Sequence, residues 1–180
     1  MNYPIYTQCE NSLRQAQEIL DSLRQRRAIT ETTIRDIHRR RHTADIAMQA
    51  TFEELRHAFI TPIDREDIWR LRQITEAVVH STEDAILTFF RHRQSVMHPN
   101  DNALLCAVNT ACRLLQAAME SFPSYPRSNT VLGHLTALEM QLRQCEELTG
   151  SEIGDAPLKN ISAACFSAAE ILRYILLKVT

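Results

Sequence analysis

Apolar residues recur every three or four positions along most of this chain, the spacing that places them on one face of an α-helix. The stripes predict helices over about residues 8–26, 31–58, 65–93, 102–121, 129–148 and 158–180. The break near 26–30 is weak, so the first two segments could also form one continuous helix. No segment alternates as a half-buried strand does. Long helices with short connections predict an all-α, antiparallel six-helix bundle.

One corner between the second and third segments is predicted in detail. Pro62 cannot continue a helix and disfavours helical geometry at Thr61, so the preceding helix must end near residues 58–60. Asp64 suits an N-cap, and Asp67 stands three residues later, where a capping-box acid belongs. Glu66 adds negative charge at the positive end of the helix dipole. These residues predict a sharp turn followed by a helix.

Composition narrows the class of protein. A chain of 180 residues with three Gly fits a single helical domain, 1–180. Five Cys, without a C-x-x-C pair, indicate reduced thiols that mostly face the core. The N-terminus lacks a basic region followed by an apolar run, and no apolar stretch approaches the ~20 residues of a membrane span. We therefore expect a soluble, cytoplasmic protein. The net charge of −2 argues against nucleic-acid binding.

The corner sequence Phe-Ile-Thr-Pro-Ile-Asp-Arg-Glu-Asp-Ile, residues 59–68, resembles the signature of PhoU-like phosphate transport regulators, in the branch that accompanies Pit-type inorganic phosphate permeases. The resemblance is carried by Phe59, Thr61, Pro62, Asp64, Arg65, Glu66 and Asp67. A looser likeness runs from about residue 8 to the ending Ile-Leu-Arg-Tyr-Ile-Leu-Leu-Lys. It implies a PhoU-like bundle of two three-helix halves that regulates such a permease.

The same resemblance implies iron or zinc clusters held by acids at i and i+4, a spacing that puts both carboxylates on one helix face. The four family pairs fall on residues 41/45, 76/80, 139/143 and 163/167. Half of the eight positions keep a metal-binding side chain: Asp45, Glu76, His80 and Glu139. Arg41 and Arg143 stand where acids would be, and Ala163 and Ser167 offer no strong ligand.

A guanidinium can supply the positive charge that grouped carboxylates need. We therefore hypothesise that Arg41 pairs with Glu76 or Asp45, and Arg143 with Glu139, in place of metal ions. Ordinary salt bridges between neighbouring helices of a bundle would use the same acidic and basic residues, so both interpretations stay open.

A remodelled metal site is the sharper alternative. His38 and His42 lie one helical turn apart, and Asp45, Glu76 and His80 could complete an iron or zinc site. The intervening Arg39-Arg40-Arg41 would repel a dication. A ferritin-like di-metal oxidase needs two E-x-x-H motifs, and the chain offers one, at residues 54–57 beside the corner.

No phosphate-binding Gly-rich loop or hydrolase motif is present, so we predict that the protein is not an enzyme. An arginine-rich stretch over residues 24–41 is typical of a solvated helix face, or of a surface that docks on anionic lipid or acidic permease loops. The interpretation is a regulatory or accessory protein of phosphate transport that acts by contact with a permease, at the inner face of the membrane. We expect no cofactor, and a homodimer is compatible with an exposed apolar helix face. The alternative function is a metal-binding bundle for iron or zinc storage or redox chemistry.

Overall fold

Six long helices form the part of the chain that the structure describes. This computed structural model describes residues 4–24, 30–57, 61, 63–91, 99–122, 128–148 and 156–179. The helices are α1 (Pro4–Arg24), α2 (Glu31–His57), α3 (Arg65–Arg91), α4 (Pro99–Ser121), α5 (Ser128–Leu148) and α6 (Ala156–Val179). No strand occurs within these ranges, so the predicted all-α class and the number and order of helices are confirmed there.

The two helices that begin furthest ahead of their predicted starts both begin at a proline. α1 starts at Pro4 instead of residue 8, and α4 starts at Pro99 instead of residue 102. The first turn of a helix leaves its N–H groups without intrahelical partners, so a residue that lacks an N–H fits there without loss. Proline thus marks a helix start at both sites.

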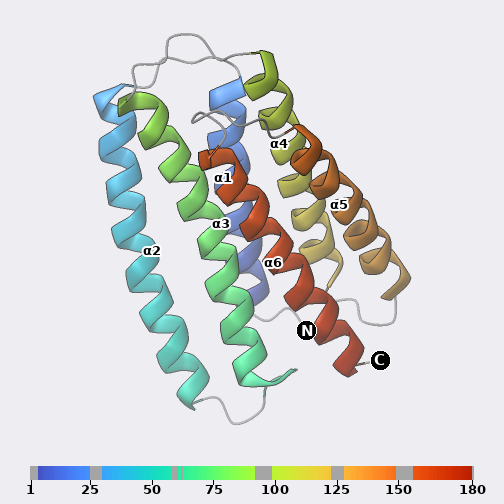
Figure 1. Ribbon diagram of the computed structural model, residues 1–180. Coiled ribbons are helices and arrows are strands. Elements are labelled where there is room, and N and C mark those ends of the chain that lie inside the picture. The colour runs from blue at the N-terminus through green and yellow to red at the C-terminus, as the bar shows by residue number, and fades with distance from the viewer. Residues whose placement is uncertain are drawn as a thin grey trace.

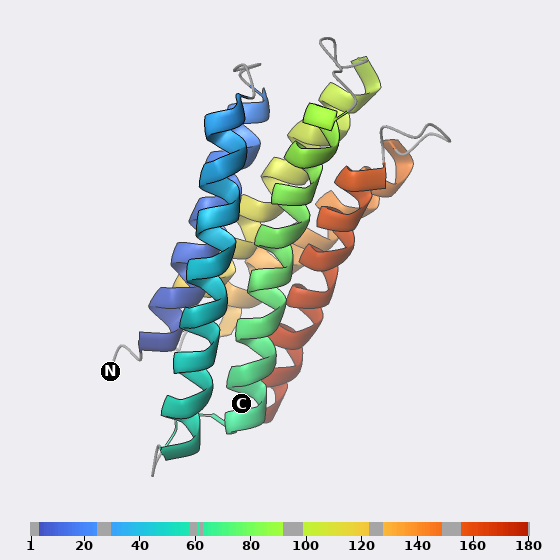
Figure 2. The ribbon, with the colours of Figure 1, turned by 90° about the vertical axis from the view of Figure 1, so that its left-hand side faces the viewer.

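The helices run roughly alongside one another, with α2 and α5 at opposite edges of the bundle (Figure 1). α3 packs against α1, α2 and α6, whereas α5 packs against α4 and α6. The first three helices meet the last three along the α1–α4 and α3–α6 contacts. The view turned by 90° shows α2, α3 and α6 side by side (Figure 2). The internal twofold that the family resemblance implies stays a prediction.

α3 is the central helix and the most thoroughly buried helix of the first three. Its apolar residues Ile68, Leu71 and Val78 join the main core, but the same helix also buries the charged residues Arg72, Glu76 and Glu83. Buried charges need partners, because removing a charge from water is costly. Arg72 and Glu76 pair with each other on α3, and further partners come from α1 and α2; together they define the candidate site described below.

The predicted corner leads into α3 at Arg65, directly after Asp64. The Ile68 N–H donates to the Asp64 carbonyl at 3.0 Å, which closes the first helical turn. Lys178 near the C-terminus donates to the carboxylates of Asp64 (2.9 Å) and Asp67 (2.8 Å). These carboxylates raise the pKa of Lys178, so the corner is tied to the end of α6 by charge. Phe59 and Pro62 of the signature lie outside the described residues.

α6 bears on the expectation that no segment is apolar over the length of a membrane span. By length and composition alone, Ala156–Lys178 is apolar enough to cross a membrane. The same composition suits a core helix, and α6 packs against α3, α4 and α5. The predicted helix over 158–180 was not counted as a candidate span, because α6 intersperses a few polar residues and has no unbroken apolar run of that length.

Candidate functional site

Charged and polar side chains gather where α2 lies along α3 and α1, and we call this group the polar seam. It consists of Ser12, Arg41, Asp45, Arg72, Glu76, His80, Glu83 and Asp84. The seam brings together half of the eight residues predicted as metal ligands or charge substitutes: Arg41, Asp45, Glu76 and His80. It is built mainly by α3, whose residues 72, 76, 80 and 83 recur at the three- and four-residue spacing of one helix face.

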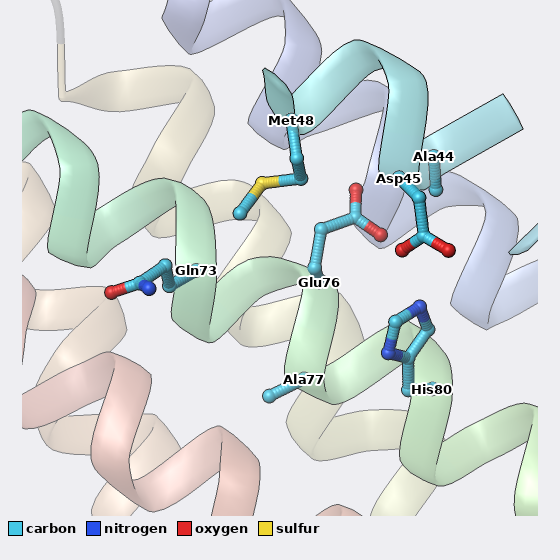
Figure 3. A pocket seen from close by; sticks show the side chains of 7 residues that line it. All are labelled: Ala44, Asp45, Met48, Gln73, Glu76, Ala77 and His80. Atoms are coloured by element: carbon cyan, nitrogen blue, oxygen red, sulfur yellow. The ribbon is translucent and has the colours of Figure 1, made fainter. Parts of the chain in front are cut away.

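A pocket of about 320 Å³ opens between α2 and α3. Figure 3 shows Asp45 of α2 and His80 of α3 pointing toward each other, with the Glu76 carboxylate beside them. Met48, Gln73 and the small side chains of Ala44 and Ala77 complete the lining. The structure therefore brings together three of the four predicted family ligands: Asp45, Glu76 and His80.

Inside the bundle, Glu76 is held by a buried three-residue group. Arg72 donates from its Nη1 to Glu76 Oε1, and the same nitrogen lies 3.2 Å from the Ser12 hydroxyl oxygen. The Ser12 hydroxyl donates to Glu76 Oε1 at 2.8 Å. Arg72 and Glu76 are 3% and 6% exposed, so each supplies the opposite charge that the other needs at that depth.

Arg41 of α2 forms the second ionic contact of the polar seam. Its Nε donates to Glu83 at 2.7 Å, and its Nη2 donates to Asp84 at 2.6 Å and to the His80 carbonyl at 3.2 Å. Burial raises the pKa of Glu83, and the neighbouring Arg41 guanidinium opposes that rise only in part. This carboxylate is therefore more easily protonated than an exposed glutamate.

The ion-pair partners predicted for Arg41 and Arg143 were both wrong. Arg41 binds Glu83 and Asp84 rather than Glu76 or Asp45, because Glu83 lies about two turns further along α3, beside Arg41. Glu139 receives Arg173 of α6 at 2.6 Å. Arg143 is exposed and has no ion-pair partner within 4 Å among the described residues. Arg143 therefore does not replace a metal ion beside Glu139.

The two histidines of the alternative metal site also lie apart from the pocket. His38 and His42 are exposed on α2, and neither lines the pocket that holds His80. Ala163 and Ser167 are exposed on α6. The helical spacing put the histidines on one face correctly, but that face turns away from α3.

The arrangement does not fit a preformed metal centre. Within the described ranges, no three His, Cys, Asp or Glu side chains are close enough to hold one ion. Glu76 Oε1 is already occupied by donors from Ser12 and Arg72. His80 keeps one feature of a ligand, because its buried Nε2 has no hydrogen-bond partner in the described part of the chain.

Sequence reasoning missed four members of the site: Ser12, Arg72, Glu83 and Asp84. Arg72 and Glu76 stand at i and i+4, a spacing that pairs opposite charges on a helix, so this contact had a local signal. Ser12 and Glu83 had none, because their partners are separated by 64 and 42 residues. A scan of protein-family models and a search of curated proteins both find no match to this chain.

Proposed function

We propose that this protein is a PhoU-like regulatory bundle that acts by binding a Pit-type inorganic phosphate permease at the cytoplasmic face of the membrane. The proposal rests on the resemblance of residues 59–68 to the family signature and on one feature of the fold, the uncovered outer face of α2. No bond chemistry is assigned to the protein, and its effect would come from contact alone.

The outer face of α2 carries the proposal. Among its residues, only Ile37 and Thr51 are buried, although the helix is 27 residues long. Ile46 is 57% exposed on this face, and Phe52, 44% exposed, lies at its border with α3, with its ring edge-on to Trp69 at 5.4 Å between centroids. Exposed aromatic and aliphatic side chains beside arginines are typical of surfaces that bind another protein.

The test measures binding to a Pit-type permease reconstituted in nanodiscs. Ile46→Glu and Phe52→Glu place a charge on the α2 face and are expected to weaken binding at least tenfold. Met140→Glu is the matched control, because Met140 is 70% exposed on α5 at the opposite edge. Circular dichroism checks that all three variants fold. Absence of binding by the native chain, or equal losses in all three variants, would overturn the proposal.

A metal-binding bundle is the second candidate, and the unpartnered Nε2 of His80 is the observation that favours it. Elemental analysis of tag-free protein purified without chelator tests this function. Stoichiometric iron or zinc that disappears in His80→Ala would replace the regulatory proposal with a metal-dependent one. Metal content near zero in the native chain would remove the second candidate.

A further inference from the structure

A second pocket lies on the other side of Glu76, between α1 and α2. Its lining is mainly basic, whereas that of the first pocket is mainly acidic. Its volume is about 240 Å³, and Glu76 lines both pockets. The first pocket is lined by two carboxylates and an imidazole, whereas the second contains three arginines: Arg39, Arg40 and Arg72. We call this second cavity the arginine pocket.

The charge balance of the arginine pocket is positive. Three guanidinium groups face a single carboxylate, Glu76, and this carboxylate is already bound by Arg72 and Ser12. Arg39 has an ion pair with Asp36 at 3.3 Å, but both side chains are exposed, and such surface pairs are weak. Arg40 has no ion-pair partner within 4 Å in the described ranges. Two positive charges are thus left for a ligand to balance.

Arg72 gives the pocket a buried donor. Arg72 is 3% exposed, and its Nε has no hydrogen-bond partner in the part of the chain that the structure describes. A buried N–H group without an acceptor costs about 1–3 kcal/mol, so such a group usually has a partner in the working protein. The donor belongs to a side chain that lines a cavity, and an entering acceptor atom could satisfy it.

Neutral hydrogen-bonding groups surround the arginines. Gln8, Gln15 and Thr43 line the pocket with amides and a hydroxyl. The Gln8 amide oxygen lies 3.0 Å from the Thr51 hydroxyl, which also lies 2.9 Å from the Ala47 carbonyl, and the rest of the Gln8 amide is left to bond a ligand. A ligand that fits this lining therefore carries negative charge together with hydroxyl groups.

We propose that the arginine pocket binds a small phosphate monoester with hydroxyl groups, of about the size of glycerol phosphate. Two forked guanidinium groups on the adjacent Arg39 and Arg40 match the oxygens of a phosphate. A phosphate monoester carries a charge of about −1.5 to −2 at pH 7, which balances the pocket. The cavity holds the volume of roughly eight liquid waters, a space suited to a ligand of about ten non-hydrogen atoms.

The experiment is calorimetric titration of the intact chain with sn-glycerol 3-phosphate, inorganic phosphate and malate. Saturable binding of glycerol 3-phosphate is expected, with inorganic phosphate weaker because it leaves the amides unused. The double variant Arg39→Gln, Arg40→Gln is expected to lose at least tenfold in affinity. Both residues lie outside the hydrophobic core, so the variant should fold. Arg35→Gln is the matched control, because Arg35 is exposed on α2 and does not line the pocket.

A lipid headgroup carries the same phosphate chemistry, so a further arm uses vesicles of phosphatidic acid in phosphatidylcholine. Binding to vesicles alone, reduced equally by Arg35→Gln and by the double variant, would mark a general basic surface and overturn the pocket. Tighter binding of malate than of glycerol 3-phosphate would overturn the assignment to phosphate esters. No binding of any probe would also overturn it. The permease plays no part in these titrations, so their outcome is independent of the proposed function.

Discussion

α2 and α5 occupy equivalent outer positions at opposite edges of the bundle, yet they are attached in different ways (Figure 1). α5 packs on both α4 and α6, and it buries Val131, Leu135, Leu138, Leu142 and Cys145. The main contact of α2 is with α3, and Ile37 is its one buried apolar residue. α5 is therefore attached by apolar packing, whereas α2 depends heavily on the ionic contacts of Arg41.

This difference predicts unequal local stability. Burial of apolar area stabilises by about 25 cal/mol per Å², whereas partly exposed ion pairs contribute little after desolvation and screening. Segments with few buried apolar contacts open at lower free energy than the core. We expect α2 to separate from α3 before the rest of the bundle unfolds, which would uncover both pockets of the polar seam.

The largest effect is expected from the core of α5. Leu135→Ala removes a fully buried side chain and should lower the free energy of unfolding by about 2–5 kcal/mol. The matched change on α2 is Leu55→Ala, at a half-buried position, with an expected loss of about 1 kcal/mol. Urea denaturation followed by circular dichroism measures both values. Equal losses would show that α2 is as firmly packed as α5.

The next effect comes from the ionic contact of α2. Arg41→Ala leaves the buried Glu83 without its hydrogen-bonded cation, at an expected cost of about 1–3 kcal/mol. Arg143→Ala on α5 is the control and should change stability by less than about 0.5 kcal/mol. Hydrogen exchange is expected to lose protection in α2 of the Arg41 variant while α5 keeps it. Uniform loss over all helices would contradict separate opening of α2.

A smaller effect is expected from pH. Burial raises the folded-state pKa of Glu83 above the ordinary 4.5, so its stabilising contribution is present below 4.5 and is lost as pH rises through the raised pKa. Glu83→Gln imitates the protonated acid and abolishes this titration. The stability of the native chain relative to the variant should therefore fall as pH rises above 4.5. A relative rise would mean that attraction to Arg41 outweighs burial.

The helices were largely predictable from the sequence because apolar spacing and proline act locally. The start of α3 at residue 65 and the ends of α2, α4 and α5 at residues 57, 121 and 148 fall within about one residue of the predicted boundaries. The tether from Lys178 to Asp64 and Asp67 was not predicted, because these residues are more than a hundred positions apart. Local rules give the helices, whereas the contacts between helices depend on how those helices are rotated against each other.

In the candidate site too, the features set within one helix were predictable and the contacts between helices were not. The i, i+4 spacing placed Glu76 and His80 on one face of α3, and both line the α2–α3 pocket. The rotation of α2 decides which of its residues meet them, and it brings Asp45 to the pocket while His38 and His42 stay exposed. The choice of Glu83 over Glu76 as the partner of Arg41 depends on the axial register of the two helices. Sequence spacing within one helix carries no information on that register.

The smallest expected effect is on the rate of cysteine labelling. This rate distinguishes local opening of α2 from opening of the whole bundle. Cys106 is exposed and should react at once with iodoacetamide, whereas Cys9 and Cys165 are fully buried. Burial raises the pKa of Cys9 to about 11, and the pKa of Cys165 is raised by its contact with Cys112, 3.6 Å away, and by burial. Both thiols therefore react only when their surroundings open.

Arg41→Ala should accelerate labelling of Cys9 several-fold and leave Cys165 unchanged, as measured by mass spectrometry of the labelled peptides. Cys9 follows Gln8, whose side chain bonds Thr51 of α2, so loss of α2 uncovers its neighbourhood. Cys165 lies on α6 against α4, in the part of the core that α2 does not cover. Equal acceleration at both thiols would mean that the bundle opens as one unit, and the difference between α2 and α5 would then be one of composition without consequence for stability.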